Sequence, residues 1–173
     1  VLSCFEIQSS TAGIRLANNN NLGIERIYRH ALQNSSNFQV LKAFFLLEAP
    51  FTYEHLAQTL DVSLPALRKK VAEINSVLQN NYRFKLKVTP ISIIGDEKDI
   101  RFFFAQYFHE AYGYFKWPFT DSKEDIEGFV RFFLDITGFP ANYANLFQIE
   151  TLIAVNLHRF RIGATIQTTG DSS

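Results

Sequence analysis

The sequence contains no methionine and a single cysteine, Cys4. One cysteine cannot form an internal disulfide, which excludes a secreted disulfide scaffold and a zinc site built on several thiolates. No stretch approaches the roughly 20 uncharged apolar residues of a membrane-spanning helix, so we expect no membrane segment. Because a complete natural chain normally starts with methionine, we expect this sequence to be a piece of a longer protein.

Short motifs that mark common enzymes are also missing. The sequence has no glycine-rich phosphate loop, no nucleophile elbow and no pair of histidines at metal-ligand spacing. Its acidic run of Asp96, Glu97 and Asp99 starts a predicted helix, where carboxylates favour the free amides of the first turn. We therefore predict no enzyme, no catalytic residue, no metal site and no cofactor.

The first ten residues, VLSCFEIQSS, alternate apolar and polar side chains. A secretory signal would instead show a basic run followed by a long apolar one. We therefore expect the protein to be cytoplasmic.

Charge is distributed unevenly along a chain whose 17 basic and 17 acidic side chains cancel. Residues 1–37 carry a balance of +1, residues 38–90 a balance of +3, and the rest a balance of −4. A basic block beside an acidic and aromatic block is typical of a nucleic-acid-binding module joined to a protein-interaction module. Chance clustering of surface lysines is the alternative.

Residues 1–17 contain two short β-type runs, 5–8 and 12–16, around Ser9, Ser10 and Gly13. This pattern predicts a hairpin with little else to pack against, which we interpret as the remnant wing of a preceding domain.

Residues 18–37 are predicted to form a linker helix that starts with an Asn cap. One helical face gathers apolar side chains at spacings of three and four, and they are Ile24, Ile27, Tyr28, Ala31 and Leu32. The polar cluster 34–37 is expected to end this helix because Asn and Ser compete for backbone hydrogen bonds.

Three closely spaced helices follow, at 38–48, from a Thr52 cap, and from a Ser63 cap. Pro65 is tolerated in the first turn of the last one, where backbone amides have no intrahelical partner. The inner stripe of that helix is Leu67, Val71, Ile74 and Leu78.

Two strands, 83–88 and 91–94, complete the block and fold about Thr89 and Pro90. Helix, helix, helix and hairpin in this order predict a winged helix-turn-helix at residues 38–95. Asp61 stands at the turn position where glycine is usual, but Asp tolerates a left-handed backbone. A purely structural three-helix core with a hairpin is the alternative.

The third helix is the predicted recognition helix. At 100° per residue, its face opposite the inner stripe is formed by Pro65, Lys69, Ala72 and Ser76. Arg68 and Lys69 can donate to guanine, and Pro65 and Ala66 can meet a thymine methyl group. Glu73 can accept from cytosine or pair with a neighbouring lysine. The predicted DNA-binding residues of this helix are Ser63, Pro65, Ala66, Arg68, Lys69, Glu73 and Ser76.

Arg83, Lys85 and Lys87 alternate along the first wing strand and therefore share a face. Such a row is suited to phosphates, which position a protein on DNA without specifying sequence. We predict these three residues as further DNA contacts.

Residues 96–173 are predicted to be a helical-bundle domain with helices at 98–115, 122–137 and 143–160. They hold 12 of the 18 phenylalanines, and the three helices are expected to bury one another. An aromatic surplus could form a patch for a partner copy, so we predict a homo-oligomer. The predicted fold class is mainly α with small β wings.

From Leu41 to Phe119 the sequence resembles the Mga (M protein trans-acting positive regulator) family of bacterial transcription activators. The resemblance is carried by LAQTLDVSLPALRKKVAEIN, by TPISIIGDEKDIRFFFAQYFHEAY and by WPF at 117–119. Members carry two N-terminal helix-turn-helix domains followed by phosphotransferase-system regulation domains. The resemblance therefore implies that residues 1–17 belong to a first DNA-binding domain and that residues after 96 start the first regulation domain.

Histidines of such regulation domains can be phosphorylated by sugar-uptake proteins, which implies a phosphocarrier as a partner. His109 and His158 are the candidate phosphorylation sites here. Packing of His109 inside an aromatic helix is the structural alternative.

We therefore predict a sequence-specific regulator of the Mga type, an activator that binds double-stranded DNA. The alternative is a protein-interaction or sensor module whose winged helix no longer binds DNA. RNA binding is a third option, through phosphotransferase antiterminator relatives, but those relatives lack this winged helix.

Overall fold

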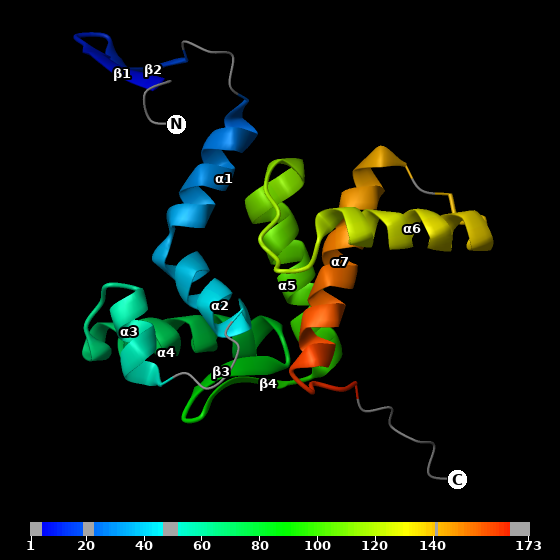
Figure 1. Ribbon diagram of the computed structural model, residues 1–173. Coiled ribbons are helices and arrows are strands. Elements are labelled where there is room, and N and C mark those ends of the chain that lie inside the picture. Colours follow the sequence, from blue (N-terminus) through cyan, green and yellow to red (C-terminus); the bar gives the residue numbers. More distant parts are fainter. Residues whose placement is uncertain (1–4, 19–22, 47–51, 141, 167–173) are drawn as a thin grey trace.

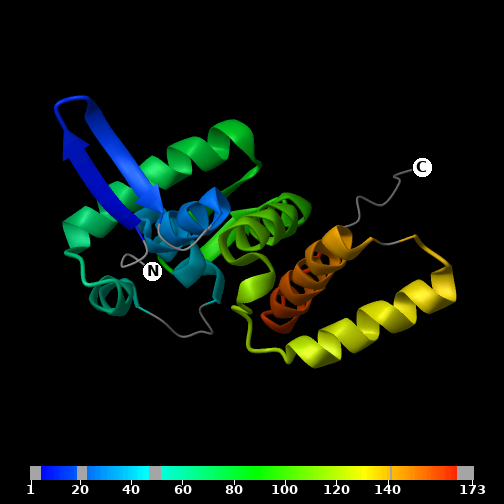
Figure 2. The ribbon, with the colours of Figure 1, turned by 90° about the horizontal axis from the view of Figure 1, so that it is seen from above.

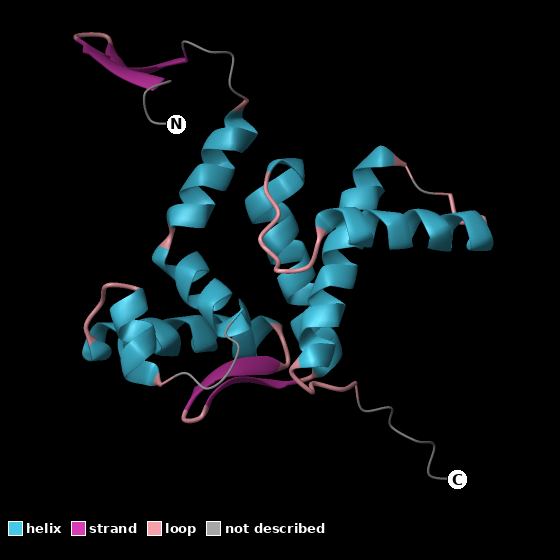
Figure 3. Cartoon of the chain, in the orientation of Figure 1, coloured by secondary structure: helices cyan, strands magenta, loops and turns pink. Residues whose placement is uncertain are grey.

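The computed structural model describes residues 5–18, 23–46, 52–140 and 142–166, and it is mainly helical with two β-hairpins (Figures 1 and 3). The predicted fold class is confirmed. Among the helices of the described ranges, none is long and apolar enough to cross a membrane.

The first hairpin consists of β1 (Phe5–Ser10) and β2 (Gly13–Asn18), paired antiparallel from Phe5 opposite Asn18 to Ser10 opposite Gly13. The predicted hairpin is therefore confirmed. It lies beyond the start of α1, away from the packed helices (Figure 1).

Helix α1 (Ile24–Asn34) differs from the prediction at its start. Its N-cap is Gly23, which offers no side-chain cap, so the predicted Asn cap is wrong. No side chain of α1 is buried, and Ile24 is 81% exposed. Leu32 packs partly against the core, and polar contacts with α5 also hold the helix, including a bond from Gln33 Nε2 to the carbonyl oxygen of Ala111 at 2.6 Å.

Only Ser35 separates α1 from α2 (Ser36–Leu46), so the polar break after α1 is shorter than predicted. The hydroxyl of Ser35 accepts a bond from the Phe38 amide at 3.2 Å and so caps the new helix. The predicted end of this helix, at 47–50, lies outside the described residues.

The predicted helix-turn-helix and wing are confirmed as α3 (Tyr53–Thr59), α4 (Leu64–Asn81), β3 (Phe84–Val88) and β4 (Ile91–Gly95). All four residues of the predicted α4 stripe are buried. The two strands pair antiparallel, from Phe84 opposite Gly95 to Val88 opposite Ile91.

The remaining elements are α5 (Glu97–Tyr112), a 3-10 turn η2 (Gly113–Phe115), α6 (Lys123–Thr137) and α7 (Tyr143–Arg161). These agree with the three predicted helices to within a few residues. Gly138 ends α6 in a left-handed conformation, with φ of 62°.

Aromatic packing joins the winged helix directly to α5. The ring of Phe45 in α2 lies 4.4 Å from Phe104 and 5.2 Å from Phe108, measured between centroids. Buried apolar residues from α2 to α7 form one continuous cluster. The core thus runs across the predicted boundary at residues 95 and 96, and the division into domains stays a prediction.

The expectation that the last three helices bury one another holds for only one side of α6. This helix packs on α7 through Ile126 and Val130 and leaves all three of its aromatic residues exposed. In two perpendicular views it projects from the side of the molecule opposite α3 and α4 (Figures 1 and 2).

Candidate nucleic-acid interface

A tight turn links α3 to α4 and fixes the angle between them. The amide of Val62 donates to the carbonyl oxygen of Ala57 at 3.0 Å, and the amide of Asp61 donates to Gln58 at 3.1 Å. These two bonds form a Schellman motif, which needs a left-handed residue at the position of Asp61. Asp61 adopts that conformation, with φ of 52°, as the sequence predicted.

The N-terminus of α4 is capped as predicted. The Ser63 hydroxyl accepts a bond from the Ala66 amide at 3.3 Å, and Pro65 occupies the first turn. The cap satisfies one of the free amides of that turn and fixes where the helix starts.

The face of α4 opposite the buried stripe is open to solvent. Its exposed residues include all the predicted base-contacting positions, which are Pro65, Ala66, Arg68, Lys69, Glu73 and Ser76. Lys70 is only partly exposed and its ammonium lies 3.1 Å from a carboxylate oxygen of Glu73. Glu73 therefore balances a lysine of its own helix, which leaves Arg68 and Lys69 as the basic side chains at the N-terminal end.

Two of the three predicted wing residues form an exposed row. Lys85 and Lys87 point away from the core, whereas Phe84 and Leu86, which alternate with them along the strand, are buried. On the opposing strand, Lys85 stands across from Ile94 and Lys87 across from Ser92. Both ammonium groups thus lie on one face of the wing.

Arg83 is placed differently from the prediction. Its guanidinium binds both carboxylate oxygens of Asp99, at 2.8 and 3.1 Å, and lies 3.2 Å from Asp96. The hydrogen bond to Asp99 raises the pKa of Arg83, and the nearby charge of Asp96 adds to this. Arg83 therefore joins the base of the wing to the start of α5, and the two lysines remain as its phosphate candidates.

Asn75 is a positioning residue that the sequence analysis missed. Its side-chain amide donates to the carbonyl oxygen of Leu86 at 2.9 Å and accepts from the Leu86 amide at 2.7 Å. This pair of bonds ties β3 to the middle of α4, so the wing lysines are held at a fixed place relative to α4. In the sequence, the only sign of this role is that Asn75 is a polar residue next to the buried stripe of α4.

Gly95 allows the wing to turn into α5. Its φ is 144°, and a Cβ at this position would collide with the backbone of Arg83 and Phe84. The amide of Asp96 then donates to the Arg83 carbonyl oxygen at 2.8 Å. Only glycine is compatible with this close approach.

The acidic run at the start of α5 does more than favour free amides. Asp96 caps the helix as predicted, accepting from the Lys98 amide at 2.9 Å. Glu97 instead forms a buried ion cluster with Arg101 of α5, at 2.9 Å, and Arg159 of α7, at 2.7 Å. Burial raises the pKa of the Glu97 carboxyl, but the bonds and charges of the two arginines outweigh it and hold the pKa below its usual range.

The two candidate phosphorylation sites have different surroundings. His158 is buried, and its Nε2 lies 2.6 Å from the Phe45 carbonyl oxygen. His109 is partly exposed, and its Nδ1 is buried with no hydrogen-bond partner in the described part of the chain. Burial lowers the pKa of His109, and the nearby Arg29 lowers it further, against the opposing effect of Glu110.

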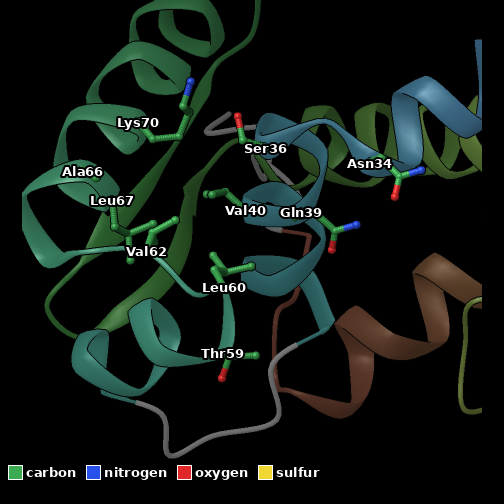
Figure 4. Close-up of a pocket in the computed structure, with 10 residues that line it drawn as sticks. All are labelled: Asn34, Ser36, Gln39, Val40, Thr59, Leu60, Val62, Ala66, Leu67 and Lys70. Atoms are coloured by element: carbon green, nitrogen blue, oxygen red, sulfur yellow. The ribbon is translucent and has the colours of Figure 1, made fainter.

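A pocket of about 510 Å³ lies between α2 and the turn before α4 (Figure 4). The side chains of Val40, Leu60 and Val62 converge in it. Among the described residues that line it, Lys70 carries the one charge. Within the described ranges, no group of three or more His, Cys, Asp or Glu side chains could hold a metal ion.

Comparison with known proteins decides the family. Residues 20–108, about half of the chain, match the Mga helix-turn-helix domain. The chain belongs to the Mga family. The match includes the whole winged helix and most of α5, so the resemblance seen in the sequence is confirmed.

This Mga-family chain is also 34% identical, over 165 residues, to a protein of Streptococcus pneumoniae serotype 4 whose name describes it as a trans-acting regulator. The similarity covers 95% of this chain and 33% of the relative. The chain thus spans about a third of the length of the curated relative that it matches.

Proposed function

We propose that this chain is the DNA-binding part of a sequence-specific transcription regulator that acts on double-stranded DNA as a homo-oligomer. The observation that carries the proposal is the geometry of α4. Its four apolar stripe residues are buried, its opposite face is open, and a tight turn fixes it to α3. This is the arrangement in which a recognition helix lies in the major groove.

In this proposal Arg68 and Lys69 donate to the O6 and N7 atoms of guanine, because the N-terminal part of a recognition helix lies nearest the base edges. Pro65 and Ala66 supply apolar contact for a thymine methyl group. Ser76 extends the same open face toward the middle of the helix, and Ser63 acts by holding the helix start.

Lys85 and Lys87 bind phosphates in this proposal and so fix the position of the protein on the duplex. Arg83 is left out of this role because its guanidinium is already bound by two carboxylates. Asn75 positions the wing for these contacts through its two bonds to Leu86.

Fluorescence anisotropy against a duplex selected from a random library, and against random duplex, tests these roles at several salt concentrations. Lys69→Ala should cost about 1–3 kcal/mol on the selected duplex and relax preference at one base pair. Lys85→Ala should weaken binding to both duplexes equally and lower the salt slope by about one contact.

Lys116→Ala is the matched control, because it removes the same charge from an exposed site that follows η2, beyond the far end of α5. That end lies about 24 Å of helix from the wing. If Lys69→Ala matches Lys116→Ala on every duplex while the fold stays intact, α4 is not the recognition helix. The interaction-module alternative then becomes the better account.

The finer proposal is an activator in the bacterial cytoplasm that responds to the sugar phosphotransferase system. It is supported by the family resemblance, and a reporter gene whose transcription falls when the protein is deleted tests the activator role. Incubation with a phosphorylated phosphocarrier, followed by mass spectrometry, tests phosphorylation. His109 is the accessible candidate, and His109→Ala should abolish the phosphorylated species. We propose no catalytic role.

A further inference from the structure

Helix α6 carries an apolar face that nothing in the described part of the chain covers. We call the set Phe129, Phe132, Phe133 and Ile136 the α6 face. Their side chains are 55%, 63%, 48% and 68% exposed, in that order. They recur at spacings of three and four residues, so they lie together along one side of the helix.

The α6 face is distinct from the side of the helix that packs on α7. Ile126 and Val130 are buried, Leu134 packs partly against the same core, and all three recur at a spacing of four residues. At 100° per residue the two sets are centred about 110° apart. The core contact therefore occupies one side and leaves the α6 face open.

The exposed area is large enough for a specific contact. Taking about 200 Å² for a phenylalanine, and slightly less for isoleucine, the α6 face exposes about 450 Å². A two-fold pair that covers this face on both copies removes about 900 Å² before any flanking side chain is counted, close to the ~1,000 Å² of a specific interface. Phe139, just past the helix end, is a further 58% exposed.

We propose that the α6 face is the contact between two copies of this chain. The proposal rests on the proposed homo-oligomer and assigns its surface. A closed two-fold interface must match itself, and a face of four apolar side chains with no charge among them does so. In two perpendicular views α6 lies on the opposite side of the molecule from α3 and α4, so pairing through it leaves both recognition helices open (Figures 1 and 2).

In a two-fold pair, the residues nearest the axis contact the same residues of the second copy, and the middle of the α6 face lies nearest the axis. In a parallel helix pair every residue of the face meets its own copy, and in an antiparallel pair the central residues do. Phe133 is central in the α6 face. Its replacement by a charge therefore brings two like charges together at the contact.

Sedimentation velocity over a micromolar concentration series is the primary test. The native chain should form dimers, and Phe133→Asp should be monomeric over the same range. Phe102→Asp is the matched control, because Phe102 is 61% exposed but lies on α5, outside the α6 face. This control should dimerise as the native chain does, and circular dichroism and urea unfolding should show all three chains folded.

A mixing experiment tests the two-fold geometry itself. Phe133→Arg and Phe133→Asp should each be monomeric alone, and an equimolar mixture should recover the dimer because opposite charges then meet at the axis. For the same pair of substitutions at Phe102, the fraction of dimer should be the same in the mixture as in each variant alone. Recovery on mixing cannot arise from variants that simply fail to fold.

The outcomes separate this proposal from the proposed homo-oligomer. A native dimer that persists in Phe133→Asp overturns the α6 face but keeps the oligomer. A native chain that stays monomeric overturns both, and the α6 face is then left for another part of a longer protein. DNA binding through α4 is tested independently, because Phe133→Asp should keep native affinity for a single half-site.

Discussion

Helices α4 and α6 are built alike but differ in what this chain does with their apolar side chains. Both start at a capping serine, Ser63 and Ser122, and they contain 18 and 15 residues. Helix α4 buries its whole stripe and shows solvent a polar face, whereas α6 buries two residues and shows solvent four large apolar ones. Periodicity thus predicts a helix, but not which of its faces is covered.

The neighbours of the two helices explain the difference. Helix α4 is surrounded by α2, α3 and β3, so its stripe is enclosed from several sides. Helix α6 has α7 as its main partner, and one neighbouring helix can cover only one side. An apolar face on a helix with a single neighbour is therefore a candidate contact surface.

The largest effect should come from the buried ion cluster that anchors α7, the partner of α6. Glu97→Ala should lower the free energy of unfolding by about 3–5 kcal/mol, since it leaves the buried Arg159 and the largely buried Arg101 without their counter-charge. Urea unfolding measures this loss. A change under about 1 kcal/mol would show that the cluster does not hold α5 and α7 together.

Truncation of the two apolar faces compares α4 and α6 directly. Leu67→Ala should cost about 2–5 kcal/mol, because Leu67 is fully buried. Phe132→Ala should change stability by no more than about 0.5 kcal/mol at concentrations where the chain is monomeric. Equal losses in the two variants would mean that the α6 face is covered within the chain, contrary to the structure.

A smaller effect is expected at the clamp between α4 and the wing. Asn75→Ala should cost about 1–3 kcal/mol, because it leaves both the amide and the carbonyl oxygen of Leu86 without their partner. Asn81→Ala, which loses a bond within the exposed end of α4, is the control and should cost less. If Asn75→Ala leaves stability and DNA affinity unchanged, the wing is positioned by the core alone.

The smallest expected effect is on the loss of stability at acidic pH. Because the folded-state pKa of Glu97 lies below its unfolded value, near 4.3, its contribution is present above that pH and is lost as pH falls through the folded-state pKa. Asp99, whose pKa is lowered chiefly by its bond from Arg83, acts in the same direction. Urea unfolding between pH 7 and 3 should therefore show a shallower acid loss for Glu97→Gln than for the native chain; parallel curves would contradict this.

Local patterns predicted most of the winged helix. The Ser63 cap, the buried α4 stripe, the left-handed Asp61 and the wing strands all follow from short-range chemistry, which is readable in a few neighbouring residues. The exposed positions of Lys69 and Ser76 followed from the same helical spacing.

The features that the sequence analysis missed depend on contacts between distant residues. Asn75 meets Leu86 across the wing, and Arg83 meets Asp99 at the start of α5. The packing of Phe45 on Phe104 likewise joins elements that the sequence suggested were separate domains. No local spacing identifies such partners.

The most direct test of the contrast between α4 and α6 is amide hydrogen exchange of the native chain with and without the selected duplex, at a concentration that keeps its oligomeric state constant. Binding should slow exchange in peptides covering the start of α4, where first-turn amides lack helical partners, and the wing strands. Peptides from α6 should be unchanged. If the duplex slowed exchange in α6 but left exchange in α4 and the wing unchanged, the proposal that α4 binds DNA would be contradicted.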